Sequence, residues 1–322
     1  MGWRLFLALG LGLAVLAVVL LRFDLSAVTA ALERAGWGGF AVIVLAGLAA
    51  EVVLALGLYP LLAEAPSLPV IVAARQLRDS SGDVLPITQL GGVAFGARAL
   101  VLAGVKAVPA SAAVTADLTT ETFAQGLYVL VGVLASLSLL HADAALSPYV
   151  GAMLGAALFL SLGSIGFAVL QMAGGRWVDK LSARLFPRPA GDAGMFHDAI
   201  HAIYRRRGRV ALSILLQFAG WIASGVWLWV MLAVMGFRQS LGAAVAIQAL
   251  VEGLRSATVF VPASLGIQEA GYAMLAPVFG FTAEVGLALS LLRRARDVVV
   301  AVPVLLAWQA IEGRRAVKGR GP

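Results

Sequence analysis

The stretch "ALVEGLRSATVFVPASLGIQEA" (residues 249–270) places charged residues, a proline and a glycine inside an otherwise apolar region. A related pattern occurs earlier, in "QLRDSSGDVLPITQLGG" (76–92). In both, an arginine precedes a proline by seven or eight residues, and a glycine follows the proline by four or five. Proline and glycine interrupt helices, and lipid cannot satisfy the backbone groups that a break releases. We therefore expect both breaks to be packed within protein or to line a wet cavity.

The composition predicts an all-α, polytopic membrane protein. Of the 322 residues, 61% are hydrophobic and 13% are charged, whereas soluble domains are about 45–50% apolar and about 25% charged. The net charge of +7 comes largely from loops, which indicates membrane topology and contact with anionic lipid rather than nucleic-acid binding. With no cysteine, the chain forms no disulfide and no thiolate metal site.

Hydropathy predicts six full spans, at about 3–22, 37–61, 109–140, 147–173, 209–236 and 284–311. We interpret the first as a retained span rather than a signal peptide, because its apolar run is too long and no cleavage site follows. Two further apolar regions are irregular: 67–105, interrupted by "RDSSGD" (78–83), and 240–281, interrupted near Pro262. The basic stretch 174–209 and the basic C-terminal tail should be cytoplasmic, which places both termini inside.

This topology makes the two irregular regions inverted relative to each other. Region 67–105 must begin and end at the cytoplasmic side, and region 240–281 at the outer side. Each is either a pair of full crossings or a re-entrant hairpin, and we favour two oppositely oriented hairpins. The chain is then one transmembrane domain with repeat halves at about 37–173 and 209–312, joined by a basic linker at about 174–208. Inverted repeats with broken helices are a recurrent transporter plan.

Ionised residues inside the predicted helices are a further informative feature. Each costs about 2.5–3.5 kcal/mol at the centre of an isolated membrane helix, so such residues must pair or face a hydrated cavity. Glu121 and Arg296 lie 30 residues after the glycines of the two patterns. They carry opposite charges, and we expect them to meet or to flank one cavity. Glu252 and Arg255 are three residues apart and can pair on one helical face.

The arginines near residue 295 suggest a ligand. Arg293, Arg294 and Arg296 stand against Asp297 alone in the local sequence, and this surplus of positive charge is expected to attract an anionic group. The alternative is that the intramembrane charges are internal salt bridges that hold a helix bundle together. For Arg78, within "RDSSGD", the alternative is a solvated cytoplasmic loop.

The candidate binding residues share a polar side chain within or beside an apolar helix, and we expect them to line a groove for a lipid headgroup. The set is Arg78, Gln89, Arg98, Glu121, Glu252, Arg255, Gln268, Glu269, Arg293, Arg294, Arg296 and Asp297. The expected structural breaks are Pro86, Gly91, Pro262 and Gly266.

Sequence motifs for chemistry are weak. His197 and His201 are four residues apart, but no third ligand stands out, so an amphipathic interfacial helix is favoured over a metal site. We find no nucleophile elbow and no phosphate loop. We therefore expect no cofactor, no bound metal and no enzymatic activity.

Two pairs of stretches carry a resemblance: "LPITQLGGVAFGARAL" with "TADLTTETFAQ", and "EGLRSATVFVPASLGIQEAGYAML" with "ALSLLRRARD". They resemble the flippase-like transmembrane family that includes the membrane part of lysylphosphatidylglycerol synthases, and in particular a subgroup encoded beside hopanoid-biosynthesis genes. The resemblance implies a bacterial inner-membrane protein that moves lipid between leaflets, with a hopanoid or related lipid as cargo. Because no soluble acyltransferase domain follows Pro322, aminoacyl transfer is not expected.

The favoured hypothesis is therefore a lipid flippase in which the arginines attract an anionic or polyhydroxylated headgroup. Its partners are a membrane lipid, either a hopanoid or a phospholipid, and the bilayer itself; a homodimer is left open. One alternative is an intramembrane enzyme that modifies a lipid headgroup, with Glu121 or Glu269 as general base. Another is a non-catalytic scaffold for lipid synthesis.

Overall fold

The computed structural model describes residues 25–64, 66–84, 89–139, 192–257 and 266–318, together with scattered positions between 155 and 169. These residues form helices and no strand, which confirms the all-α fold. The helices are α2 (Leu25–Ala55), η1 (Leu56–Leu61), α3 (Leu68–Val84), α4 (Gln89–Leu102), α5 (Ala107–Leu139), α8 (Asp192–Arg205), α9 (Arg207–Val234), α10 (Leu241–Ala257), α11 (Ile267–Leu275), η4 (Ala276–Phe279) and α12 (Ala283–Lys318).

Three segments among the described residues are long and apolar enough to cross a membrane: Glu33–Leu61, Ala107–Ser136 and Arg207–Val234. They coincide with the predicted spans 37–61, 109–140 and 209–236. The predicted span 284–311 lies within α12, a single helix of 36 residues. The predicted span 3–22 lies outside the described residues, as does most of 147–173.

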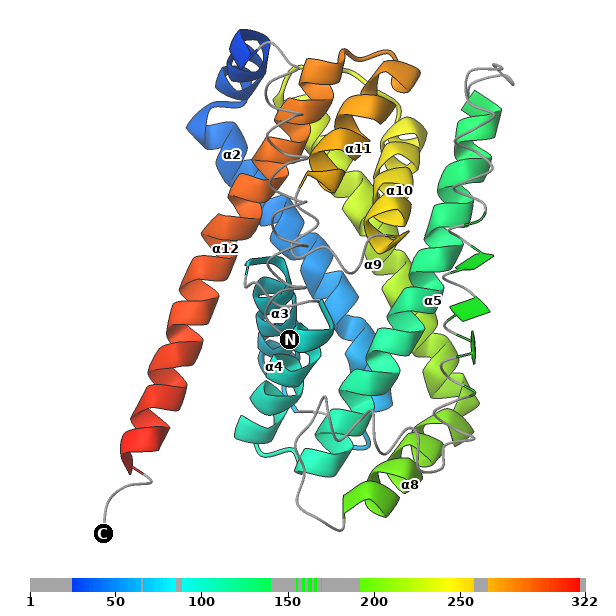
Figure 1. Cartoon of the computed structure of the whole chain (residues 1–322), viewed down its shortest axis with the longest axis vertical. Helices are drawn as coiled ribbons and strands as arrows, with labels where there is room; N and C mark the ends of the chain where they lie inside the picture. The colour runs from blue at the N-terminus through cyan, green and yellow to red at the C-terminus, as the bar shows by residue number, and fades with distance from the viewer. Residues whose placement is uncertain are drawn as a thin grey trace, which may run out of the picture.

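The long helices α2, α5 and α9 run along the molecule, with α9 packed against both of the others. In Figure 1 the helices α3 and α4 lie in the lower half of the molecule, and α10 and α11 lie in the upper half. Within each pair the two helices pack on each other. The shorter members, α4 with 14 residues and α11 with nine, extend only about 21 and 14 Å, too short to cross about 30 Å of hydrocarbon. Their re-entry into a membrane stays a prediction.

The first pair of helices is not interrupted at "RDSSGD" (78–83). Helix α3 continues through "RDSSGD" to Val84, so the interpretation of this stretch as a solvated loop is wrong. Arg78, Ser80 and Ser81 are buried, and the Ser81 hydroxyl donates to the carbonyl oxygen of Arg78 at 2.9 Å. The helix survives because its polar side chains find partners inside the bundle.

The predicted helix breaks have different outcomes. Gly91 lies inside α4 and does not end a helix, so that prediction is wrong. Gly266 directly precedes α11 with φ at 77°, a left-handed conformation that favours glycine, so this break is confirmed. Pro86 and Pro262 lie outside the described residues.

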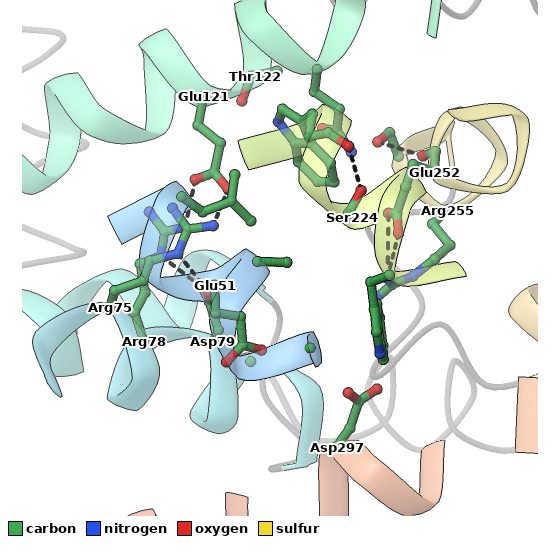
Figure 2. Close-up of a pocket in the computed structure, with 18 of the residues that line it drawn as sticks. Glu51, Arg75, Arg78, Asp79, Glu121, Thr122, Ser224, Glu252, Arg255 and Asp297 are labelled. Atoms are coloured by element: carbon green, nitrogen blue, oxygen red, sulfur yellow. Dashed lines mark hydrogen bonds and ion pairs between the residues drawn. The ribbon is translucent and has the colours of Figure 1, made fainter. Parts of the chain in front are cut away.

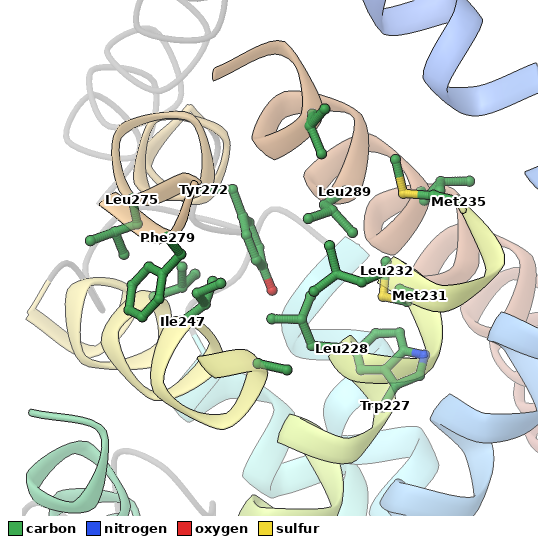
Figure 3. Close-up of a cluster of buried hydrophobic side chains, with 14 of the residues drawn as sticks. Trp227, Leu228, Met231, Leu232, Met235, Ile247, Tyr272, Leu275, Phe279 and Leu289 are labelled. Atoms are coloured by element: carbon green, nitrogen blue, oxygen red, sulfur yellow. The ribbon is translucent and has the colours of Figure 1, made fainter. Parts of the chain in front are cut away.

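The buried apolar side chains form two main clusters. We call the first the upper core; it centres on Leu228, Met231, Ile247, Tyr272 and Leu289 (Figure 3). The second, the lower core, includes Ile71, Leu100, Ala113, Phe196 and Ile200. Helices α2 and α5 supply buried residues to both clusters.

Along the two helices that contribute to both cores, a charged residue lies between the upper-core and the lower-core positions. Along α2 the upper core reaches Ala50 and the lower core begins at Ala55. Glu51 lies between them. Along α5 the lower core reaches Ala116 and the upper core resumes at Val133, with Glu121 between. A polar layer therefore separates the two cores.

Close helix packing in the upper core depends on Gly286. A Cβ atom at this position of α12 would meet the backbone carbonyl of Tyr272 on α11 closer than real Cβ atoms approach. We expect Gly286→Ala to destabilise the protein by about 1–3 kcal/mol through overpacking, measured as a lower unfolding temperature in detergent. Gly313→Ala, in the same helix with open space around it, is the control and should be neutral or stabilising. Equal effects of the two substitutions would refute this account.

Candidate functional site: a charged cavity between two cores

A cavity of about 180 Å³ lies in the polar layer (Figure 2). Helices α2, α3, α5, α10 and α12 supply its ionisable side chains, and α9 adds Trp221, Ser224 and Trp227. Five arginines and five carboxylates line it, so its formal charge is zero. They are Arg75, Arg78, Arg255, Arg293 and Arg296, with Glu51, Asp79, Glu121, Glu252 and Asp297.

One ion-pair network joins α3 to α5. Arg78 donates to Asp117 at 2.9 Å and to Glu121 at 2.5 Å. Arg75 contacts the other oxygen of Glu121 and lies 2.5 Å from Asp79. Residues three or four positions apart share a helix face, so the spacing within each helix places Arg75 and Arg78 on the face of α3 that meets Asp117 and Glu121 on α5. Arg75 bridges two carboxylates, and Arg78, which also contacts Asp79 at 3.0 Å, bridges three, as the rigid fork of donors of a guanidinium allows.

A polar seam extends this network toward η1 and α9. The Gln217 amide donates to Asp117 at 2.7 Å, Thr120 and Ser213 share a hydrogen bond of 3.0 Å, and the Ser213 hydroxyl donates to the carbonyl oxygen of Gly57 at 2.8 Å. A Cβ atom at Gly57 would lie 2.5 Å from the Gln217 side chain. This glycine therefore makes room for the amide that supports Asp117.

A second network joins α10, α11 and α12. Glu252 accepts from Arg293 at 2.6 Å and from Arg255 at 3.2 Å, which confirms the predicted pairing of Glu252 with Arg255. Arg293 also donates to the Tyr272 hydroxyl at 3.1 Å, and that hydroxyl donates to Gln248 at 2.6 Å. The Gln248 amide donates back to Glu252 at 3.0 Å, which closes a ring of hydrogen bonds.

A third group links the two halves of the chain. Arg296 on α12 donates to Glu51 on α2 at 2.5 Å and to Asp297 at 3.1 Å. The Arg296 guanidinium carbon also lies 5.2 Å from the centre of the Trp227 ring, within cation–π range. A Cβ atom at Gly47 would lie 2.8 Å from the Arg296 Nε atom, so the small residue leaves space for this arginine.

Glu121 and Arg296 were predicted either to meet or to flank one cavity, and the second arrangement is confirmed. Both side chains line the same cavity. They do not pair with each other, because Glu121 binds Arg75 and Arg78 while Arg296 binds Glu51 and Asp297.

The expected surplus of positive charge near residue 295 is wrong. Each of the three arginines binds a carboxylate from another helix, which the local sequence does not reveal. The pairs are Arg293 with Glu252, Arg294 with Glu269, and Arg296 with Glu51.

Four candidate residues lie outside the lining of the cavity. Arg98, with its side chain 51% exposed, pairs with Glu312 at 2.8 Å. Glu269 is buried against Arg294 at 2.7 Å, and the Gln268 amide donates to a serine hydroxyl on α12 at 3.2 Å. The side chain of a fifth candidate, Gln89, lies outside the described residues.

Sequence reasoning left several site residues out of the candidate set. Arg75 and Asp117 had a usable signal, because they lie three and four positions before Arg78 and Glu121 and so share their helix faces. Gln217 had none, since a lone glutamine in an apolar helix gives no partner. Glu51 and Asp79 were visible as charges, but only the tertiary structure brings them to the cavity.

Helix α8 was predicted as an amphipathic helix and is observed as one, with Phe196 and Ile200 buried in the lower core. Its His197 and His201 rings lie 4.4 Å apart. No group of three or more potential metal ligands occurs in the part of the chain that the structure describes.

Comparison with known proteins assigns the chain to a family. A family profile described as the lysylphosphatidylglycerol synthase TM region matches residues 5–304, a range that includes every residue lining the cavity. The chain belongs to this family. No curated protein and no solved structure matches it. Together with the apolar helices, membership identifies a membrane protein, and the family description points to lipid synthesis or handling.

The paired charges lead to a stability prediction. Glu121→Gln removes a carboxylate that binds two buried guanidinium groups, and leaving buried charges without full pairing costs about 3–5 kcal/mol. We expect a clear fall in unfolding temperature in detergent. Glu312→Gln breaks an exposed pair and should cost no more than about 1 kcal/mol. If the two variants show the same fall in unfolding temperature, the α3–α5 network does not stabilise the protein more than an exposed ion pair does.

Proposed function

We propose that the protein moves a lipid with a polar headgroup between the leaflets of the bacterial inner membrane. The observation that carries the proposal is the charged cavity between the two apolar cores of a membrane protein from a lipid-associated family. Well-packed apolar residues would hold a bundle together as well as buried ion pairs do, or better. Ten ionisable side chains around one cavity therefore favour a functional role.

The arrangement of the helices supports transport. The α3–α4 pair and the α10–α11 pair lie in opposite halves of the molecule (Figure 1), and α3 and α10 both supply charged residues to the cavity. In transporters with inverted repeats, the site lies at the repeat interface, and rocking of one part against the other opens it to alternate sides. We infer that the cavity is the passage point for a headgroup and that both termini face the cytoplasm.

The size of the cavity supports a lipid cargo over a soluble one. At about 180 Å³ it is smaller than the roughly 300–1,000 Å³ of sites that enclose whole ligands. A headgroup fits such a space if the acyl chains or hopanoid rings stay in the bilayer. Guided by the resemblance, we propose a hopanoid or a phospholipid as the cargo class. One chain forms the cavity, so the proposal does not require a homodimer.

We also propose that the protein is not an enzyme. Glu121 accepts from two guanidinium groups, and Glu269 is buried against Arg294. Both carboxylates are held in ion pairs, which disfavours both as general bases.

Transport is tested with purified protein in liposomes that contain acyl-labelled lipids, where quenching from outside reports movement between leaflets. We expect movement faster than in empty liposomes. Glu121→Gln and Arg296→Gln, compared per folded molecule, should slow it at least about tenfold, because hydrogen bonds to charged groups contribute about 1.5–3 kcal/mol each. Arg98→Gln, at an exposed ion pair outside the cavity, should leave the rate unchanged.

The proposal would be contradicted if lipids with several different headgroups moved between leaflets no faster than in empty liposomes, also with a pH gradient. Mass spectrometry of the recovered lipids separates transport from the enzymatic alternative, since only an enzyme alters the headgroup. If the protein is a non-catalytic scaffold, Glu121→Gln and Arg296→Gln should leave its function in cells intact.

A further inference from the structure

Three of the five carboxylates that line the cavity are more accessible than its arginines. The side chains of Glu51, Asp79 and Asp297 are 19%, 22% and 20% exposed, whereas the five lining arginines are between 5% and 10% exposed. The three carboxylates come from α2, α3 and α12, and Asp79 and Asp297 both act electrostatically on Glu51. The part of the cavity that a ligand meets first is therefore acidic.

Glu51 has capacity left for a ligand. Its Oε1 atom binds Arg296, while its buried Oε2 atom has no hydrogen-bond partner among the residues that the structure describes. Buried polar atoms in folded proteins nearly always have one. A primary ammonium, which carries three donors, would satisfy this oxygen and be attracted by Asp79 and Asp297.

The arginines, which are more deeply buried, have N–H donors without an acceptor. Within the described part of the chain, four buried guanidinium atoms lack an acceptor: Arg75 Nη1, Arg293 Nε, and Nε and Nη2 of Arg296. These three side chains are at least nine-tenths buried. Free N–H groups of a guanidinium are suited to the oxygens of a phosphate. The unmet donors and the unmet acceptor thus call for two different groups on one ligand.

Charge balance restricts the ligand further. The lining has a formal charge of zero, with five arginines and five carboxylates. Asp117, bound to Arg78 behind the lining, adds one negative charge, so a ligand with a net negative charge would enter a site of low dielectric without a matching countercharge, which is costly. A ligand with one positive and one negative group avoids that cost.

We propose that the cavity binds a zwitterionic phospholipid headgroup. The ammonium faces Glu51, Asp79 and Asp297, and the phosphate accepts from Arg293 and Arg296, whose guanidinium carbons lie 5.3 and 5.2 Å from the centre of the Trp227 ring. A compact headgroup such as phosphoethanolamine suits the cavity of about 180 Å³. This inference rests on the proposed function and replaces the expected anionic cargo with one of zero net charge.

The test measures binding to the purified full chain in detergent, by native mass spectrometry and by the lipid-dependent shift of unfolding temperature. The probes are phosphatidylethanolamine, its N-acetyl derivative, phosphatidylglycerol, and a dioleoyl ammonium-propane lipid that has an amine but no phosphate. We expect phosphatidylethanolamine to bind about tenfold more tightly than each of the others, since each lacks one of the two groups.

Substitutions of cavity residues test whether the preference for phosphatidylethanolamine arises in the cavity. Asp79→Asn and Asp297→Asn should each reduce the preference for phosphatidylethanolamine over its N-acetyl derivative toward one, and the second variant guards against a folding defect in the first. Glu312→Gln, outside the cavity, should keep the preference. Equal or tighter binding of the N-acetyl derivative or of phosphatidylglycerol by the wild-type protein would overturn the inference, and so would binding of none of the four.

The two proposals fail in different ways. A retained preference without movement between leaflets in liposomes removes the transport function and leaves the headgroup assignment. Movement of all probes at equal rates, with equal binding, removes the headgroup assignment and leaves transport.

Discussion

The structure depends on the pairing of charges that are buried among apolar helices. Ionised groups are too costly to leave unpaired away from water, so each arginine of the cavity must lie close to a carboxylate. The carboxylates come from other helices in most cases: Arg78 reaches α5, Arg293 reaches α10, and Arg296 reaches α2. These pairs fix how five helices meet around one cavity and separate the apolar interior into two cores.

Small residues make this pairing sterically possible. Gly47 leaves space for Arg296, and Gly57 leaves space for the Gln217 side chain that supports Asp117. Close approach through small residues is a common way for membrane helices to pack, because the lipid gives no hydrophobic drive toward association. Here the same glycines also bring polar groups within hydrogen-bond distance.

A balanced but incompletely satisfied site is suited to transient binding. Most ionic groups of the cavity pair with each other, which keeps the bundle stable without a ligand, while several guanidinium donors and the Oε2 atom of Glu51 have no partner among the described residues. A ligand that satisfies them gains energy without having to replace the whole network. A transport site must bind its cargo and also release it, and residual capacity of this kind is compatible with both.

The sequence by itself determined the helical membrane class, three of the long spans and the Glu252–Arg255 pair, because hydropathy and spacing along one helix are local properties. It also indicated that Glu121 and Arg296 share a cavity. The tertiary structure alone decided which carboxylate each arginine binds, that "RDSSGD" is helical, and that Arg98, Gln268, Glu269 and Arg294 lie outside the cavity lining. Partners such as Glu51 and Arg296 are 245 residues apart, and only the packing of helices brings such residues into contact.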